Sequence, residues 1–406
     1  MKKIGNKKSL IKLIDHIYKE IGSKAAHLHE PHIFGNEHKY LSNCIEGNLI
    51  SSVGKYIRKF ENIISKFTKS KYCVATVNGT SALHLSLLSS SILSSDDIII
   101  PSFNYVAAAN VVKYIGASII FVDINKDNLT IDVNKLKYFL KKNTFKHGKN
   151  TINKNSNRKI SAIIALHTFG HPADLDELLK LSKDYNIKLI EDAAEAIGSQ
   201  YYGYHVGTFG ETGILSFNGN KIITTSAGGM LIARDAEAIN HARSLASQAR
   251  DPAPHYEHSQ VGYNYRMSNV LAGIGRAQLA SLPSKVASRQ LLFARYQDAL
   301  RDLPGIGFIP ANPKDIPNRW LSCITIDPEV TNSTPEQLRL ALEGVNVESR
   351  PLWKPMHLQP LFAGAECYGG AVSEKLFRTG LCLPSGSSIT DAQFTLVVET
   401  LRANWK

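Results

Sequence analysis

Short apolar runs alternate with longer amphipathic segments from residue 72 to about residue 192. The apolar runs predict β-strands, which are YCVATV, DIIIP, SIIFVDI, ISAIIAL and IKLIED. The segments between them predict helices, which are SALHLSLLSSSIL, VAAANVVKYI, VNKLKYFLKK and LDELLKLSKDY. Strands that alternate with helices form parallel sheets covered on both faces. We therefore predict an α/β fold with a mostly parallel central sheet and helices on both faces.

The pattern changes after about residue 212. GILSF and GGMLIA are typical of strands, whereas DAEAINHARSLASQ and a long stretch from about 267 to 302 are helical. A smaller α+β part follows, with the strand WLSCITI, a helix TPEQLRLALEG that opens on a threonine cap, and a final helix near 390–403. The expected organisation is an N-terminal segment (1–45) that packs with the small domain, a large domain (46–265) and a smaller C-terminal domain (266–406).

The composition adds limits on class and location. With 406 residues, 43% hydrophobic and 20% charged, the chain is typical of a globular protein. Its basic start has no sustained apolar region or small-residue cleavage site, and no apolar stretch is long enough to cross a membrane, so we expect a cytoplasmic protein without membrane contacts. The five cysteines form no CxxC pair and have no histidine cluster beside them, so neither a disulfide framework nor a metal site is expected.

The net charge of +12 comes mostly from lysines in the first part of the chain. An Asn/Lys-rich stretch at 141–159 lacks apolar periodicity and predicts an exposed loop, and its one aromatic residue, Phe145, is too little for nucleic-acid binding. Near residue 233 the composition changes from rich in Lys, Asn and Ile to rich in Arg, Ala and Leu. Our hypothesis for this change is a mosaic chain with two parents of different base composition.

Ligands of such a sheet bind at the carboxyl ends of its strands, so the residues that follow each strand are the candidates. After the first strand come Asn78, Gly79, Thr80 and Ser81, at the start of a helix. Glycine permits close approach of the backbone, and the amide groups at a helix N-terminus bind phosphate. An ordinary helix cap explains these four residues equally well.

Three further strand ends carry candidates. Glu191 and Asp192 end a hydrophobic strand, and a buried carboxylate there needs a cationic partner such as a protonated pyridine nitrogen; a surface carboxylate or helix cap is the alternative. Tyr105 could stack on a flat cofactor or belong to the core. His167 also lies at a strand end, where a structural histidine is the default.

Lys221 lies between two apolar runs in ILSFNGNKIITTSAGGML. Taken alone, it is a solvated lysine on a surface hairpin. The alternative is an amine placed to form a Schiff base with a carbonyl cofactor. A phosphate cradle, a stacking ring, a carboxylate for a pyridinium and a lysine, in this order along a parallel sheet, are the parts that a pyridoxal phosphate (PLP) site requires. Together they favour that cofactor over the separate explanations.

These residues resemble the DegT/DnrJ/StrS-type sugar aminotransferases, which are PLP-dependent enzymes of fold type I. The resemblance extends from about residue 30 to the C-terminus in NGTSALHLSL, PSFNYVAAANVVKYIGASIIFVDI, HTFGHPADLDEL, EDAAEAIGS, GTFGETGILSFNGNKIITT, VGYNYRMSNVLAGIGRAQL and RPLWKPMHLQPLF. Within the family the chain is most similar to enzymes that aminate UDP-4-keto-6-deoxy-N-acetylhexosamines on the routes to legionaminic acid and bacillosamine. LHEPHIFGNEHKYL resembles the first type and ESRPLWKPMHLQPLF the second, on opposite sides of the change in composition.

The resemblance implies a role for each candidate. Lys221 would form the Schiff base and move the proton, and Asp192 would pair with the pyridine nitrogen. Tyr105 would stack on the ring, Glu195 would lie near the ring oxygen, and His167 would line the site. The remaining roles are phosphate binding by Gly79, Thr80, Ser81 and Ser216, a phosphate contact from the neighbouring subunit of a homodimer by Asn264, and nucleotide-sugar contacts by Arg350, Trp353 and His357.

By the same resemblance, L-glutamate donates an amino group to the C4 ketone of a UDP-linked 4-keto-6-deoxy-N-acetylhexosamine, for bacterial surface glycans or glycoproteins. One departure is TSAGGM, where many members have Gly and Glu before the double glycine and this chain has Ser226 and Ala227. Three alternatives stay open: an aminotransferase for another nucleotide sugar such as GDP-4-keto-6-deoxymannose, a catalytically silent scaffold, and a sugar dehydratase. Dehydratases on this scaffold typically have histidine in place of the lysine, which argues against the last.

Overall fold

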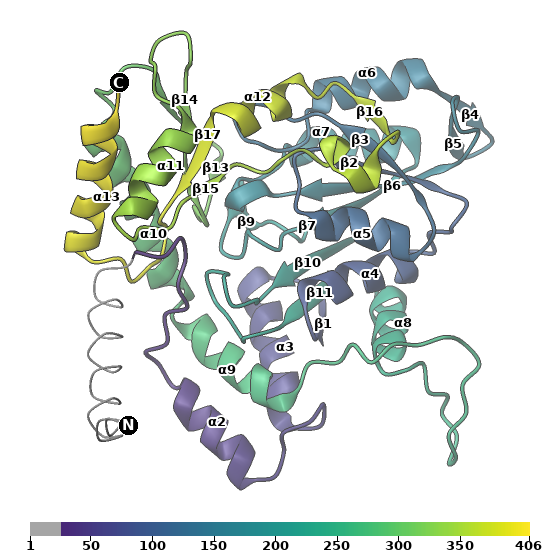
Figure 1. Ribbon diagram of the computed structural model, residues 1–406. Coiled ribbons are helices and arrows are strands. Elements are labelled where there is room, and N and C mark those ends of the chain that lie inside the picture. The colour runs from purple at the N-terminus through teal and green to yellow at the C-terminus, as the bar shows by residue number, and fades with distance from the viewer. Residues whose placement is uncertain (1–25) are drawn as a thin grey trace, which may run out of the picture.

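The computed structural model describes residues 26–406 and has two sheets of different size (Figure 1). The larger has eight strands in the order β1-β11-β10-β7-β6-β2-β3-β16. Their bounds are β1 Tyr72–Thr76, β2 Asp97–Pro101, β3 Ser118–Val122, β6 Ile160–Leu166, β7 Lys188–Asp192, β10 Thr212–Ser216, β11 Gly229–Ala233 and β16 Glu366–Tyr368. All neighbours from β10 to β16 pair in parallel, and only β1 and β10 pair antiparallel with β11. The predicted mostly parallel sheet is confirmed.

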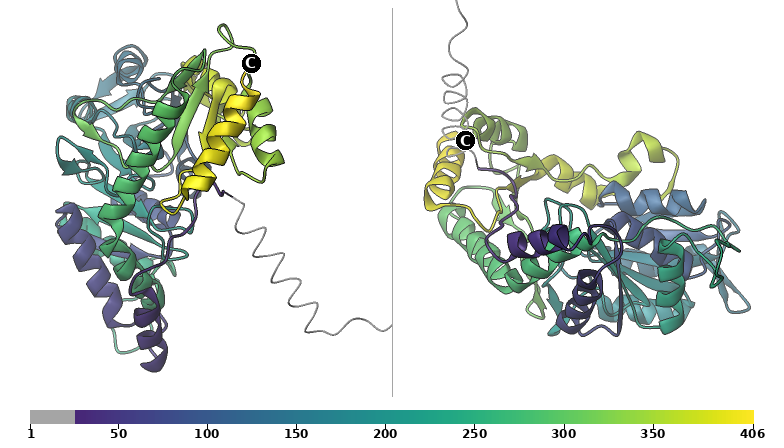
Figure 2. Two further views of the ribbon diagram at one scale, coloured as in Figure 1. Left: turned by 90° about the vertical axis from the view of Figure 1, so that its left-hand side faces the viewer. Right: turned by 90° about the horizontal axis from the view of Figure 1, so that it is seen from below.

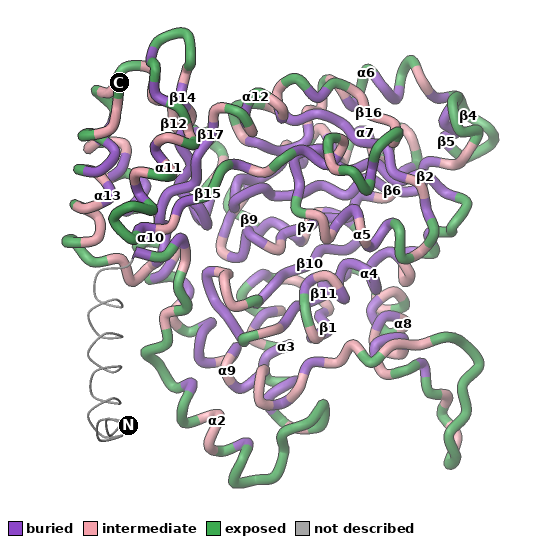
Figure 3. Tube along the Cα trace, viewed as in Figure 1, coloured by how far each residue is buried: buried purple, intermediate pink, exposed green. Residues whose placement is uncertain are grey.

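Helices cover both faces of this sheet. One face carries α4, α5 and α8, whose buried residues form one apolar cluster with the strands, and the other carries α3, α6, α7 and α9 in a second cluster. The helices are α3 Lys55–Thr68, α4 Gly79–Ser89, α5 Val106–Tyr114, α6 Val133–Asn143, α7 Leu175–Tyr185, α8 Ala236–Ala246 and α9 Asn269–Ala280. The strands run buried through the middle of the large domain (Figure 3), which explains why they are near-continuous apolar runs in the sequence.

The smaller sheet has the antiparallel order β12-β14-β17-β15 and lies beside the large one (Figure 2). A third apolar cluster joins it to α10, α11 and α13. The bounds are β12 Ile306–Phe308, β14 Ser322–Ile326, β15 Arg350–Pro351, β17 Gly380–Leu383, α10 Leu282–Leu300, α11 Pro335–Gly344 and α13 Asp391–Asn404. The predicted cap of α11 is present, because the Thr334 side chain accepts a hydrogen bond from the amide of Gln337.

The structure corrects two expectations about local structure. The long helix expected at 267–302 is two helices, because Ser281 ends α9 and Pro283 lies in the first turn of α10. The loop expected at 141–159 contains a hairpin of β4 Thr144–His147 and β5 Asn150–Asn153. Its polar side chains bond inward: Asn153 is buried and donates to Asp97 at 2.9 Å. Hydrophobic periodicity cannot reveal a strand that is held in place by polar contacts.

Parts of the chain after the domain boundary expected at residue 265 pack within the large domain. Helix α9 packs against α3 and against α2 (Glu37–Glu46), and β16 pairs with β3 in the large sheet. Residues 1–25 of the expected N-terminal segment lie outside the described residues, whereas Ala26 bridges to Val347 beside the small sheet. The remaining strands, β8 Gln200–Tyr201, β9 Tyr204–His205 and β13 Asp315–Ile316, form a three-stranded sheet that the sequence did not predict. Helix α12 (Ala371–Thr379) precedes β17.

Candidate active site

A cavity of about 790 Å³ opens between the carboxyl ends of the large sheet and the small domain. The large domain contributes residues from the start of α4, the ends of β7 and β10, and the turn that follows β10. The small domain contributes residues on both sides of β15 and the stretch before β14. The predicted site residues that line this cavity are Gly79, Thr80, Tyr105, Asp192, Glu195, Ser216, Lys221, Arg350 and Trp353.

The N-terminus of α4 forms one wall. The Asn78 side chain caps the helix by accepting from the amide of Ser81 at 2.7 Å, which leaves the amides of Gly79 and Thr80 without a protein acceptor among residues 26–406. Ser216, at the end of β10, approaches so closely that a Cβ on Gly79 would lie 2.9 Å from the Ser216 Cβ. Two free amides and a serine hydroxyl are a suitable cradle for a phosphate. The helix-cap explanation is confirmed, because Asn78 is the cap. Phosphate binding stays a prediction, and the residues after the cap line the cavity.

Asp192 ends β7 at the floor of the cavity and is 5% exposed. The amide of Ala194 donates to its Oδ1 at 3.1 Å. Burial raises the pKa of this carboxyl above its ordinary value, and the Lys221 cation only partly opposes the effect. A cationic partner in the cavity would therefore stabilise its ionised form.

Lys221 projects from the turn after β10 into the same cavity. Its Nζ lies 3.2 Å from Oε1 of Glu195, and the two side chains are 12% and 4% exposed. The other oxygen of Glu195 accepts from the amide of Phe169 at 2.9 Å. Burial raises the pKa of Glu195, although the neighbouring Lys221 charge lowers it. Lys221 is thus a largely buried amine between carboxylates and not a solvated hairpin lysine.

The turn itself survives the change at TSAGGM. Ser226 has a φ of 73°, in the left-handed region that glycine favours, and its amide donates to Oγ1 of Thr224 at 2.9 Å. The amide of Phe217 bonds to the carbonyl of Gly228, and the amide of Thr225 bonds to the carbonyl of Phe217. These bonds close the loop that carries Lys221.

Aromatic and basic side chains form the outer wall. Tyr105 is the N-cap residue of α5, and it is 61% exposed at the rim of the cavity. The centroids of its ring and of the Trp353 ring are 6.4 Å apart. Arg350 is paired with Glu348 at 3.0 Å and lines the cavity as well. A second cavity of about 420 Å³ borders the first, since Tyr105, Trp353 and Lys354 line both. Tyr105 is therefore a rim residue and not part of the core.

Four predicted residues do not line this cavity. His167 is fully buried: its Nδ1 accepts from the amide of Ala173, so the proton is on Nε2, which donates to Glu191 at 3.0 Å. His357 bridges Ser102 at 2.5 Å and Glu374 at 3.2 Å. The other two are Ser81, buried within α4, and Asn264, exposed on the chain between α8 and α9. The structural explanation of His167 is thus the one that the contacts support.

Among the lining residues that were not predicted are two aromatic side chains near Lys221, Trp320 and His29. Trp320 lies between β13 and β14, and its ring centroid is 4.0 Å from Nζ of Lys221. His29 stacks on the Trp320 ring, with the two ring centroids 5.6 Å apart and the ring planes inclined by 19°. Burial lowers the pKa of His29. Neither residue follows a strand of the large sheet, so the strand-end pattern in the sequence does not indicate them.

The donor set fits PLP. A cofactor with a phosphate, a cationic ring nitrogen and an aldehyde needs free amides, a buried carboxylate and an amine, and α4, Asp192 and Lys221 supply these in one cavity. The fold and this cavity define a PLP-dependent transferase of fold type I. Comparison with known proteins then identifies the family.

Residues 31–402 match the model of the DegT/DnrJ/EryC1/StrS aminotransferase family, and the chain belongs to this family. It is 41% identical over 382 residues to EpsN of Bacillus subtilis, named as a pyridoxal phosphate-dependent aminotransferase, with 93% of this chain and 95% of EpsN covered. It is 34% identical over 377 residues to GDP-perosamine synthase of Caulobacter vibrioides, with 91% and 96% covered. The expected enzyme class and cofactor are therefore confirmed.

Solved structures agree on the fold. The aminotransferase TlmJ of Streptoalloteichus hindustanus superposes with a TM-score of 0.83 at 25% identity, covering 93% of this chain and 98% of its own. PseC of Helicobacter pylori, an aminotransferase of pseudaminic acid biosynthesis, gives 0.83 at 21% identity, with 93% and 98% covered. Among residues 26–406, no helix is long and apolar enough to cross a membrane.

Proposed function

We propose that this sugar aminotransferase transfers the amino group of L-glutamate to the C4 ketone of a UDP-linked 4-keto-6-deoxy-N-acetylhexosamine. The observation that carries the proposal is the placement of Lys221, Asp192 and the α4 N-terminus around one cavity. A second cavity borders it at Tyr105 and Trp353, and this second cavity would offer room for a nucleotide beyond the sugar. The product would serve bacterial surface glycans or glycoproteins.

Each residue has a distinct part in the proposed mechanism. PLP, when bound, supplies an aldehyde that takes up the amino group and a ring that withdraws electrons. Asp192 would hold the ring nitrogen and favour its protonated form, because a buried carboxylate is stabilised by a positive charge. The amides of Gly79 and Thr80 and the hydroxyl of Ser216 hold the phosphate.

Lys221 moves the proton. With PLP bound, Nζ of Lys221 would act as the general base that takes the proton from the carbon bearing the amino group, and as the general acid that gives it up again. Glu195 lies 3.2 Å from that nitrogen, so it can hold the amine in place and exchange a proton with it. For the sugar, the same steps run in reverse and convert the ketone into an amine.

A GDP-linked 4-keto-6-deoxymannose is the second candidate substrate. Relatives named GDP-perosamine synthase, from Caulobacter vibrioides and Vibrio cholerae, are each 34% identical over at least 90% of this chain. Turnover of the UDP- and GDP-linked 4-ketosugars, measured side by side with L-glutamate, distinguishes the two. A higher kcat/KM for the GDP sugar would overturn the first choice.

The role of Lys221 is tested separately. PLP is added to the wild-type protein, the adduct is reduced with borohydride, and the modified residue is located by peptide mass spectrometry. We expect the label on Lys221 and no label at the site in Lys221→Ala. If the folded wild-type protein takes no label at Lys221, the chain is a silent scaffold of this fold. Lys354→Ala, at the rim of the same cavity, is the matched control and should keep the label.

A further inference from the structure

Trp320 holds the turn that carries Lys221 in two ways. The indole Nε1 donates a hydrogen bond to the carbonyl oxygen of Asn220 at 2.9 Å, and Asn220 directly precedes the lysine. The face of the same ring receives the Lys221 ammonium, with Nζ 4.0 Å from the centroid. One side chain therefore contacts both the backbone of the turn and the amine at its end.

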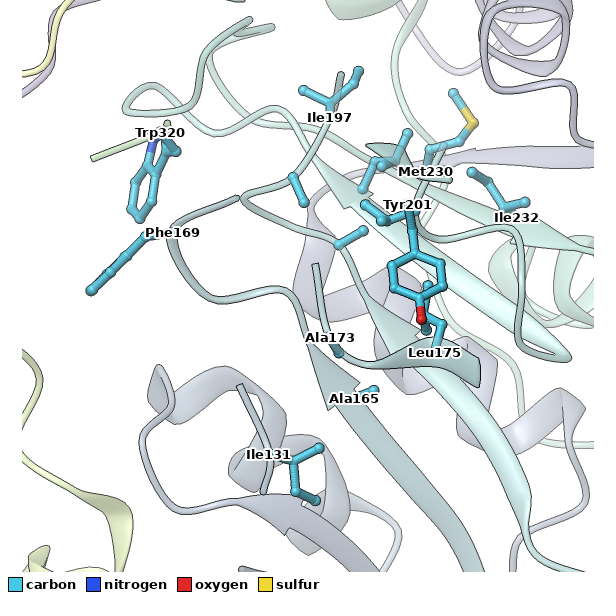
Figure 4. Close-up of a cluster of buried hydrophobic side chains, with 14 of the residues drawn as sticks. Ile131, Ala165, Phe169, Ala173, Leu175, Ile197, Tyr201, Met230, Ile232 and Trp320 are labelled. Carbon is cyan, nitrogen blue, oxygen red and sulfur yellow. The ribbon is translucent and has the colours of Figure 1, made fainter. Parts of the chain in front are cut away.

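Trp320 is itself held rigidly. Its amide donates to Oδ1 of Asn318 at 2.9 Å, and its carbonyl accepts from the buried Arg289 guanidinium. Its ring packs against Phe169 and stacks on His29 (Figure 4 shows Trp320 beside Phe169). Because Trp320 is 4% exposed and held on several sides, its hydrogen bond restrains the position of the turn.

The same stretch holds the backbone of Glu195, the residue whose carboxylate faces the lysine. The Asn318 amide group donates to the carbonyl oxygens of Glu195 and Ile197, each at 2.9 Å. The Asn318 side chain also packs tightly against Gly170. A Cβ at this glycine would lie only 1.8 Å from Oδ1 of Asn318, so no larger residue fits there. The residues before β14 thus fix the positions of both Lys221 and Glu195, although they come from the small domain.

We propose that Trp320 is a positioning residue for Lys221: its indole N–H and ring face set where the amine stands in the cavity. The inference rests on the proposed function, in which Lys221 attacks the cofactor carbonyl. Loss of the N–H leaves the Asn220 carbonyl unpaired and the turn free to shift. Loss of the ring removes the surface against which the amine rests.

The experiment separates covalent attachment from binding. Apo-protein is mixed with PLP, and the borohydride-trapped adduct at Lys221 is followed over time. The affinity for pyridoxamine phosphate, which has no carbonyl, is measured in parallel. We expect Trp320→Phe to slow adduct formation about tenfold and Trp320→Leu about a hundredfold, as misplacement of a reacting group does. The affinity for pyridoxamine phosphate should change less than twofold in both variants.

Each other outcome has a defined meaning. If Trp320→Phe forms the adduct at the wild-type rate, or if both measurements fall together, Trp320 only shapes the cavity and the inference is wrong. A wild-type protein that forms no adduct at Lys221 overturns the proposed function instead. Trp405→Phe is the control, because this indole bonds to Pro304 at the far end of α13 and should leave both measurements unchanged. If Trp320→Phe does not fold by circular dichroism, Trp320→His, which keeps an N–H donor, is compared with Trp320→Leu. Faster adduct formation in Trp320→His supports the inference, and equal rates overturn it.

Discussion

Two buried carboxylates and one amine meet at the floor of the cavity. Glu195 has Lys221 as its counter-ion, but Asp192 has only one amide donor, and burial raises the pKa values of both carboxyls. Without cofactor, the ionised form of Asp192 is therefore destabilised by its loss of hydration. A cationic ring nitrogen in the cavity would offset this cost. This imbalance of charge is what distinguishes a binding carboxylate from a structural one such as Glu191, which is fully buried but accepts from three amides and from His167.

Asp315 gives a pH-dependent prediction at the scale of one residue. Burial and the nearby Asp174 raise its pKa to about 6 from 3.8. A carboxyl with a raised folded-state pKa stabilises the protein below its unfolded pKa, and this stability is lost as the pH rises through about 6. Asp315→Asn should therefore match the wild type near pH 4 and exceed its free energy of unfolding at pH 7 by about 1 kcal/mol, after discounting for the half-exposed position.

Urea unfolding of both proteins from pH 4 to pH 7 provides the measurement. Asp298→Asn is the control, because that carboxyl is 76% exposed on α10 and should leave the pH dependence unchanged. Parallel curves for the wild type and Asp315→Asn would show that Asp315 titrates normally in the folded protein.

At the scale of single residues, the sequence predicted which reactive side chains lie in the cavity better than it predicted the contacts that each side chain makes. Lys221 and Asp192 were found because a strand-end position and a reactive side chain coincide in the sequence. His167 satisfies the same criterion, yet its ring is turned into the protein, and only the acceptor and donor on its two nitrogens reveal this. Trp320 was missed because it lies in the small domain and contacts Lys221 from about a hundred positions away in the chain.

The contact between α4 and β10 is the element-scale feature on which phosphate binding depends. At Gly79 the two elements leave no room for a side chain, because a Cβ would lie 2.9 Å from Cβ of Ser216. Gly79→Ala should push these elements apart and weaken binding of pyridoxamine phosphate at least tenfold, since the free amides would no longer converge on one anion.

Isothermal titration with pyridoxamine phosphate measures this effect. Gly344→Ala is the matched control, because nothing lies within 4 Å of a Cβ at the end of α11. The phosphate cradle would have to be placed elsewhere if Gly79→Ala bound the ligand as tightly as the control.

The elements themselves were predicted where burial follows a simple period. Strands β1, β2, β3, β6, β7, β10 and β11 are apolar because helices cover both faces of the large sheet, so the sequence pattern is sufficient. Strand β16 is only three residues long and joins the sheet at its edge, and the β4–β5 hairpin is held by polar contacts such as Asn153 to Asp97. Neither produces an apolar run, which is why both were missed.

The whole molecule brings the two domains together around the cavity. The large domain supplies the groups that fit the cofactor, and the small domain supplies Trp320, Arg350 and Trp353. One predicted contributor, Asn264, remains outside. It follows a stretch between α8 and α9 that extends from the body in Figure 1 and is largely exposed in Figure 3. Tyr256 and Val261 on this stretch are 81% and 78% exposed.

A shared site predicts complementation between two inactive variants. We assume that each site uses Lys221 of its own subunit and Asn264 of the neighbouring subunit. Lys221→Ala then disables the site of the subunit that carries it, whereas Asn264→Ala disables the site of the neighbour. After unfolding and refolding together in equal amounts, half of the dimers are mixed, and each mixed dimer has one site with both residues intact. Activity should therefore return to about a quarter of the wild-type value, starting from near zero for Lys221→Ala alone. Refolding each variant by itself is the control. If the mixture only averages the two separate activities, each site is complete within one chain, and Asn264 acts on its own subunit or on none.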